Sequence, residues 1–419
     1  MPGFSGLVTR RAALGLLAAT ATGLLAACAG GSQPTPTTAP ASAPKPTEAA
    51  KPAGAAQSGA AAPTSAPAQS AAKATAGGWP DYYPANYAET VEASRSEQKL
   101  LVYSIMSKDN WKPVLDEFKT RYGWIDVEAL DLGSYEVFER FYSESAGGAR
   151  TADMIITSAP DGWQDFIKRG ELADYKSPEE DKVPPFTRLA PGVYTASTDP
   201  MVFIWNKKLV QTPPRTMAEL GEMVSKDASK FAPAKVVSYE ENNATGFAAN
   251  WFWAKKVGED KAFQVLESIG KVRPKLDSSA GRMVDATLAG ETLIGYFVST
   301  ISVLPRLPQA QEVLGWAMIG DGTPVIVRGM GVTKKAQSPN SAKLLLDFIM
   351  SAPGQLAFAN GGLTAYRADV ADQAKAHVSK LATDIGEQNL AFFSFDPDIA
   401  DAGKREAFRA RLKTALGRG

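Results

Sequence analysis

Strands and helices alternate regularly in the hydrophobic pattern of the longer, C-terminal part of the chain. The continuous apolar run from Lys99 to Ser104 predicts a strand buried on both faces, and Ile125 to Leu130 and Asp153 to Thr157 predict two more. Apolar residues at helical spacing predict helices from Asn110 to Tyr122 and over residues 134–146. This order is typical of an open parallel sheet, whose ligands bind beyond the carboxyl ends of the strands.

The pattern changes at residues 191–210, where short strands at 192–194 and 201–206 are separated by polar residues. We interpret this stretch as a crossing into a second lobe, and residues 315–333 as the return crossing. Two crossings make a hinge. Within the second lobe we expect helices near 216–229, 245–257 and 259–271, a helix opening at Ser278 and ending at Gly290, and a buried strand from Thr292 to Val298.

The part that can fold begins near Trp79 and contains about 340 residues, which exceeds the usual size of one hydrophobic core. We therefore predict an α/β protein with two lobes. Residues 79–200 plus 325–419 form lobe 1, and residues 201–324 form lobe 2.

The first 78 residues have a different composition. Two arginines, Arg10 and Arg11, precede an apolar segment that ends in Leu25-Ala26-Ala27-Cys28, the layout of an export signal over residues 1–27. From Ala29 to Gly78 there is no Val, Ile, Leu, Met or aromatic residue, so this stretch cannot bury a core and is predicted to be a disordered tether. The Leu-Ala-Ala-Cys ending resembles the bacterial lipobox, and the paired arginines resemble the twin-arginine export motif. The resemblance implies that Cys28 is lipidated and anchors an exported lipoprotein to the cell membrane.

Charge and residue counts exclude several classes of function. Lys+Arg and Asp+Glu both number 45, so nothing in the charge balance favours nucleic acid. The single cysteine is used by the anchor, and the single histidine, His377, excludes ordinary zinc chemistry. We expect His377 to be exposed and the paired carboxylates Glu179-Glu180 to be solvated. We also expect a monomer.

Several segments follow one another in a characteristic order: Glu97 to Ser104, Ala152 to Ile156, Gly170 to Tyr175, Trp205 to Val210, Gly290-Glu291, Asp321 to Pro324 and Pro339 to Leu344. This ordered set resembles the extracellular solute-binding lipoproteins of bacterial ABC importers, in the group that includes ferric-ion, phosphonate and thiamine binders. The resemblance implies a two-lobe, type II periplasmic-binding-protein-like fold that closes over a ligand. It also implies a permease in the cytoplasmic membrane as partner.

Three strand ends or helix starts are predicted to face the cleft between the lobes. Backbone N–H groups at helix N-termini, together with serine hydroxyls, suit an anionic ligand, although each serine could equally be only a helix cap. Tyrosines near the crossings could contact the ligand or belong to the core. The candidate ligand-binding residues are Ser104, Met106, Ser107, Ser158, Ala159, Tyr194, Ser278, Ser279, Tyr296 and Ser299.

No motif indicates catalysis. The chain has no phosphate-cradling Gly-x-x-x-x-Gly-Lys-Ser/Thr loop, and the Ser-x-x-Lys match at Ser268 to Lys271 lacks its companion motifs. We predict no catalytic residue, no cofactor and no bound metal. The expected function is capture of a small anionic solute by lobe closure and its delivery to an ABC permease.

Three alternatives remain open at this stage. Ferric-ion binders of the same family use adjacent tyrosines after the Gly-Glu pair, but the segment Gly295 to Ile301 contains only Tyr296, which favours an oxyanion over iron. A receptor that feeds a signalling partner is the second alternative. A two-lobe α/β hydrolase or lyase is the third, and a chain with one histidine and no free cysteine argues against it.

The lipid anchor gives the first testable prediction. Replacing Cys28 by Ser removes the thiol that would carry the acyl chains, so we expect a chain that is released from the membrane or left unprocessed. Membrane fractionation and mass measurement of the N-terminus check this. A Cys28→Ser chain that is processed and membrane-bound as before would contradict it.

Overall fold

A computed structural model describes residues 78–419. The predicted signal peptide, Cys28 and the tether up to residue 77 lie outside the described residues. The strands are β1 (Leu100–Ser104), β2 (Val127–Asp131), β3 (Met154–Thr157), β4 (Arg188–Ala190), β5 (Val193–Asn206), β6 (Val236–Tyr239), β7 (Lys275–Asp277), β8 (Ile294–Ser299), β9 (Leu314–Ala317), β10 (Thr323–Val332) and β11 (Leu390–Phe392). The helices are α1 (Tyr87–Ser94), α2 (Lys108–Arg121), α3 (Glu136–Ala146), α4 (Pro160–Lys168), α5 (Met217–Lys226), α6 (Ala228–Phe231), α7 (Ala244–Val257), α8 (Glu259–Gly270), α9 (Ala280–Leu288), α10 (Thr300–Val303), α11 (Leu307–Ala310), α12 (Pro339–Met350), α13 (Ala352–Asn360), α14 (Val378–Leu381), α15 (Pro397–Ala400) and α16 (Ala402–Ala415).

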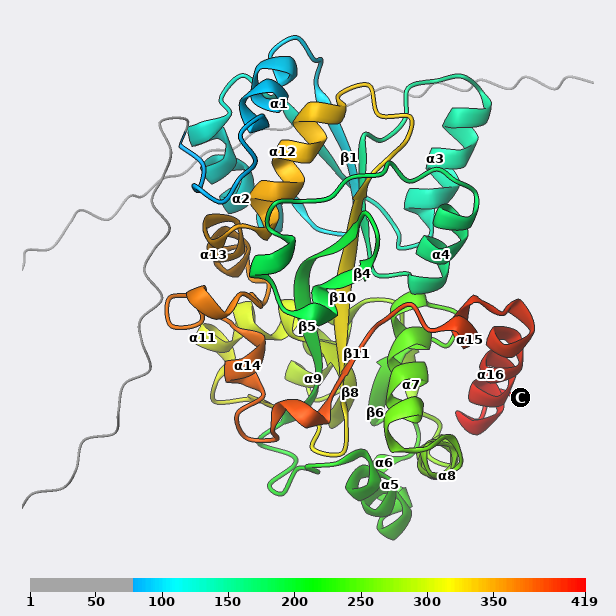
Figure 1. The fold of residues 1–419 in the computed structure, drawn as a ribbon. Helices are drawn as coiled ribbons and strands as arrows, with labels where there is room; N and C mark the ends of the chain where they lie inside the picture. Colours follow the sequence, from blue (N-terminus) through cyan, green and yellow to red (C-terminus); the bar gives the residue numbers. More distant parts are fainter. Residues whose placement is uncertain (1–77) are drawn as a thin grey trace, which may run out of the picture. The chain divides into compact units, whose positions relative to one another are not determined.

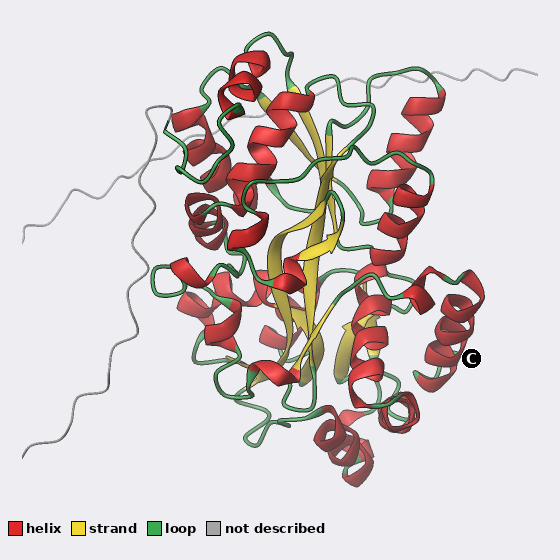
Figure 2. Cartoon of the chain, in the orientation of Figure 1, coloured by secondary structure: helices red, strands yellow, loops and turns green. Residues whose placement is uncertain are grey.

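These strands form one continuous sheet with helices on both sides (Figure 1, Figure 2). Its main order is β2-β1-β3-β10-β5-β8-β6-β7, with β11 added to β10 and both β4 and β9 added to β5. None of the helices in residues 78–419 is long and apolar enough to cross a membrane. The α/β class and the two-lobe fold predicted from the sequence are confirmed by the solved structures compared below.

The outer strands of each half pair in parallel, as the strand–helix alternation predicts. β1 lies parallel to both β2 and β3, and β6 lies parallel to β7 and β8. The central strands differ, because β10 runs antiparallel to β3 and to β5. The sheet is therefore mixed rather than wholly parallel, and the reversal occurs where the chain crosses between the two halves.

The first crossing is one long strand rather than two short ones. β5 runs unbroken from Val193 to Asn206; its first half pairs with β10 and its second half with β8 and β9. The prediction of two strands was wrong because the polar residues Thr195 to Pro200 looked like a loop, whereas all of them are buried. A polar stretch can continue a strand when neighbouring strands satisfy its backbone, as β10 does for the first half of β5.

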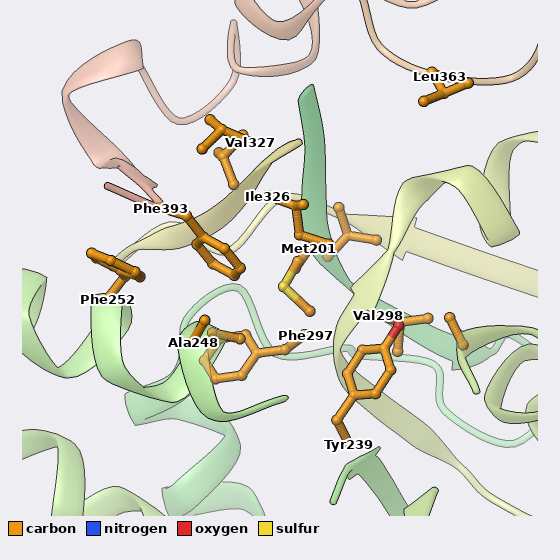
Figure 3. Close-up of a cluster of buried hydrophobic side chains, with 14 of the residues drawn as sticks. Met201, Tyr239, Ala248, Phe252, Phe297, Val298, Ile326, Val327, Leu363 and Phe393 are labelled. Carbon is orange, nitrogen blue, oxygen red and sulfur yellow. The ribbon is translucent and has the colours of Figure 1, made fainter. Parts of the chain in front are cut away.

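A buried apolar cluster encloses the crossing strands (Figure 3). Met201 of β5 and Ile326 of β10 lie in it beside Phe297 of β8. Phe252 of α7 stacks on Phe393 with ring centroids 5.2 Å apart. Burial of each such side chain stabilises the fold by about 1.5–3 kcal/mol, so this cluster holds the two crossings together.

The C-terminal helix connects both halves. Phe408 of α16 packs on rings of α7 and α8, with Phe263 at 5.2 Å and Trp251 at 5.0 Å between ring centroids (Figure 1). Arg405 and Arg409 of the same helix reach the other half, where Arg405 lies 3.5 Å from Asp161 and Arg409 donates to the hydroxyl of Tyr135. The division of the chain at residues 200 and 324 stays a prediction, and α16, which we assigned to lobe 1, packs on helices assigned to lobe 2.

Two polar residues expected at the surface are buried. Glu179 is fully buried and forms an ion pair with Arg367 at 2.5 Å, so the expectation that the pair Glu179-Glu180 is solvated was wrong for its first member. His377 is 2% exposed; its Nδ1 accepts from the backbone N–H of Ser379 and its Nε2 lies 3.0 Å from the carbonyl of Arg367. Both residues lie in polar stretches of sequence, and these stretches do not show that each side chain has a buried partner in the folded protein.

Asp347 is a buried carboxylate that titrates near neutrality. It lies on α12 and accepts hydrogen bonds from Tyr87, Tyr175 and Ser177. Removal from solvent raises the pKa of Asp347 to about 7, although the three hydroxyl donors lower it. Because the pKa in the unfolded chain is about 3.8, the folded state binds this proton more tightly. The stability that the folded state gains from this bound proton is complete below about pH 4 and is lost as the pH rises through 7.

The second prediction follows from this loss of stability with rising pH. Asp347→Asn removes the titrating group, so its free energy of unfolding should fall less between pH 5 and 8 than that of the unmutated chain. The difference in slope is at most about 1.4 kcal/mol per pH unit. Urea unfolding at several pH values measures it.

Ser177→Ala serves as the matched control, because it removes one hydrogen bond to Asp347 but leaves the carboxyl group in place. This variant should keep the pH dependence. If the free energies of unfolding of Asp347→Asn and of the unmutated chain fall equally between pH 5 and 8, Asp347 does not titrate in this pH range.

Candidate functional site

A cleft of about 1180 Å³ lies between residues predicted for the two lobes. The lining includes Ser107 and Asn110 with residues 359–362 on one side, and Ser279 and Gly281 with residues 304–306 on the other. Arg328 of β10 also lines the cleft. Pockets for small ligands usually occupy about 300–1,000 Å³, so this cleft accommodates a small molecule with room for the lobes to approach.

The N-terminus of α2 forms the first wall. Ser107 caps this helix: its Oγ accepts from the backbone N–H of Asn110, and the side chain of Asn110 accepts in return from the N–H of Ser107. The helix therefore begins at Lys108, two residues before the predicted start at Asn110. Asn110 also donates to the carbonyl of Gly361 at 2.7 Å, and a Cβ at Gly361 would lie 2.4 Å from the Asn110 carbonyl. Only glycine permits this approach of the end of α13.

The N-terminus of α9 forms the opposite wall. Ser279 caps it by accepting from the N–H of Arg282, and a Cβ at Gly281 would lie 3.4 Å from the Arg306 side chain. The guanidinium of Arg282 is occupied by Asp277 at 2.6 Å and by the hydroxyl of Ser278. The two helices thus direct capped N-termini, with their positive dipole ends, into one cleft.

Asp199 and Arg328 form a buried ion pair that joins the two crossing strands. Arg328 Nη2 donates to Asp199 Oδ2 at 2.8 Å, and the two side chains are 5% and 1% exposed. Asp199 also accepts from Ser299, from Thr300 at 2.6 Å and from the backbone N–H of Ile301 at 3.2 Å. Its carboxylate is fully hydrogen-bonded. Arg328, by contrast, has two buried nitrogens, Nε and Nη1, without a hydrogen-bond partner among the described residues.

Two irregularities in the sheet flank this ion pair. The register of β5 against β10 shifts between Val327 and Gly329, opposite Arg328. The register of β5 against β8 shifts between Val202 and Ile204, and there Phe297 takes a φ of 54°, a left-handed conformation that is unusual for a bulky residue. Bulges redirect side chains and occur often beside functional sites.

The structure brings only part of the predicted site together. Ser107 and Ser279 line the cleft on opposite walls. Ser299 is buried beneath it on Asp199. Ser278 is not among the residues that line the cleft, and its hydroxyl accepts a hydrogen bond from the guanidinium of Arg282.

The other predicted residues lie in the protein interior or outside this cleft. Ser104 and Met106 are buried, and Ser104 bonds the indole of Trp111 at 2.9 Å. Tyr194 donates to Glu180, and Tyr296 is fully buried in β8. Ala159 and Ser158 are buried at the start of α4, where Ser158 lies 3.5 Å from the hydroxyl of Thr245 and lines a separate, much smaller cavity.

Arg328 was missed by the sequence analysis. It occurs inside the apolar segment Thr323–Val332, which reads as a buried strand except for this one charge. A charged residue within a buried strand needs a partner, and that requirement was the available signal. Other charged groups around the cleft are Arg306 and Lys375, together with Asp109 and Asp131. Among residues 78–419, no group of three or more His, Cys, Asp or Glu side chains is arranged to hold a metal ion.

The two halves, the double crossing and the cleft between them define a two-lobe binding protein. Solved structures with this fold include the substrate-binding protein of an ABC transporter from Agrobacterium tumefaciens, with a TM-score of 0.68 at 22% identity over 78% of this chain and 96% of that one. The periplasmic binding protein AfuA of Actinobacillus pleuropneumoniae, with fructose-6-phosphate bound, has a TM-score of 0.62 at 19% identity, over 77% of this chain and 99% of that one. Iron-bound HitA of Pseudomonas aeruginosa has a TM-score of 0.56 at 15% identity, over 75% of this chain and 99% of that one.

A sequence model of the bacterial extracellular solute-binding proteins matches residues 114–383, more than half of the chain. The protein belongs to this family. A search of curated protein sequences finds no match. Family membership confirms the resemblance seen in the sequence and the prediction of a binding protein rather than an enzyme.

Proposed function

We propose that this protein is the solute-binding component of an ABC importer and that it captures a small anionic solute in the cleft between its lobes. The observation that carries the proposal is that α2 and α9, one from each side, direct their N-termini into one cleft. Helix N-termini bind anions through free backbone N–H groups and the helix dipole. An anion between them is bound from both sides, so it favours the closed lobes.

Delivery to a membrane permease is the role proposed by analogy with the fold relatives. A lipidated Cys28, followed by a tether without Val, Ile, Leu, Met or aromatic residues, would keep the binding protein close to such a permease. Two acyl chains provide stable anchoring, whereas a single chain binds a membrane only marginally. The tether then sets how far the lobes reach from the membrane.

A prediction tests the two capped helices. Ser107→Ala and Ser279→Ala each remove a cleft hydroxyl and loosen a helix start, so each should weaken anion binding by about 1–3 kcal/mol. Thermal shifts with inorganic phosphate, citrate and fructose 6-phosphate select the probe, and calorimetry with the probe that stabilises most measures the effect.

Thr216→Ala is the matched control, because Thr216 caps α5 outside the cleft by accepting from Glu219. It should lose about 1 kcal/mol of stability without a change in binding. Equal weakening by Thr216→Ala would contradict the proposed site. So would uptake of ferric ion, with a tyrosinate charge-transfer band, by metal-stripped protein that binds no oxyanion.

Lobe closure without turnover is the next prediction. Small-angle scattering of the full-length Cys28→Ser chain, which has no site for acylation, should show a smaller radius of gyration when the selected probe is added. Mass spectrometry should recover the probe unchanged. A chemically altered probe would place the protein among enzymes, and binding without compaction would contradict capture by lobe closure.

A further inference from the structure

Arg328 has donor capacity that the described residues do not use. A guanidinium carries five N–H groups, one on Nε and two on each Nη. One hydrogen bond, from Nη2 to Asp199, is present, while the buried Nε and Nη1 have no partner. Three N–H groups on these two nitrogens are therefore unsatisfied in a side chain that is 5% exposed.

Leaving such groups unsatisfied is expensive. A buried polar group without a partner lowers stability, and a charged one does so more strongly. Natural structures rarely retain such groups without a reason, and a ligand is one such reason. Arg328 lines the cleft, so a solute bound there lies next to its guanidinium. Nε and Nη1 are buried in this conformation, and a shift of the side chain or of the cleft lining on binding would let the solute supply the missing acceptors.

We propose that Arg328 is the anchor for the anionic group of the solute, with a carboxylate or phosphate oxygen accepting hydrogen bonds from its unpaired N–H groups. This inference rests on the proposed function and adds to it the residue that recognises the charge and the chemical class of the group recognised. Guanidinium is the side chain best suited to both oxyanions, because it stays charged and presents planar donors.

The surrounding charges support this assignment. Asp199 already neutralises Arg328, and its carboxylate is occupied by Ser299, Thr300 and Ile301 as well. The anion would therefore add a negative charge to a neutral pair. The positive ends of α2 and α9, which border the same cleft, are placed to balance that charge.

The position of Arg328 also connects recognition with movement. Arg328 lies on β10 and Asp199 on β5, the two strands that cross between the lobes. The register shift opposite Arg328 sits in the same stretch of the strand pair. An anion held there touches the hinge itself rather than one lobe, so its binding acts on the axis about which the lobes move.

The main variant of the experiment keeps the buried charge balanced, and the single variants are first checked for folding by thermal unfolding. Arg328→Gln alone would leave Asp199 buried without its cation and could unfold the protein. The double variant Arg328→Gln with Asp199→Asn is neutral, as the original pair is. Asp199→Asn alone keeps the guanidinium and removes the competing carboxylate. Arg150→Gln is the control outside the cleft, since Arg150 pairs with the buried Asp153 at 3.2 Å and also has an unpaired buried Nε.

Each variant, in the full-length Cys28→Ser chain, is titrated by calorimetry with inorganic phosphate, citrate and fructose 6-phosphate, and with uncharged fructose. The double variant should bind the anionic probes about tenfold to a hundredfold more weakly, the effect of losing a hydrogen bond to a charged group. Asp199→Asn should bind them as tightly as the unmutated chain or more tightly. Arg150→Gln should bind them unchanged.

Other outcomes overturn the inference. If the double variant and Asp199→Asn behave alike, the ion pair is only structural. If fructose binds with compaction of the protein and the anionic probes do not, solute binding by lobe closure stands, while the proposed anionic specificity and the Arg328 inference both fail. If the anionic probes bind with compaction and the double variant binds them unchanged, the proposed function stands and only the Arg328 inference fails. If no probe binds and the scattering does not change, the proposed anionic specificity fails with it.

Discussion

The antiparallel pairing of β5 with β10 is the contact on which the rest of this structure depends. Each strand passes through both halves of the molecule, so the two lobes share one sheet rather than meeting at an interface. Asp199 and Arg328 join the strands at their midpoint, and the apolar cluster around Met201 and Ile326 excludes water there. The cleft lies where α2 and α9, one from each lobe, begin near this pair of strands.

Much of the fold follows from the sequence, because parallel strands buried on both faces read as apolar runs. β1 and β3 were located to within one residue. β6 and β7 were not, since four and three residues in a lobe rich in apolar helices give no distinct period. The middle of β5 was mistaken for a loop because the partners that bury its polar residues are far away in the sequence, such as Thr300 for Asp199 and Thr364 for Thr198.

The same reasoning from the sequence located only part of the candidate site. Ser107 and Ser279 follow from local rules, because a serine before a helix has a defined role wherever the helix lies. Whether such a helix faces a cleft depends on tertiary packing, which is why Ser158 and Ser104 belong to the interior while Ser107 does not. Arg328 needs both kinds of information, since its partner Asp199 lies 129 residues away.

The C-terminal helix has a mechanical consequence. With α16 packed on α7 and α8 while Arg405 and Arg409 reach Asp161 and Tyr135, the lobes are joined by a third segment, away from the residues that line the cleft. In the proposed closure, two crossings alone would permit both bending and twisting, whereas a third connection away from them would restrict the twist. The lobes would then follow nearly one path, so little conformational entropy would be lost when they close.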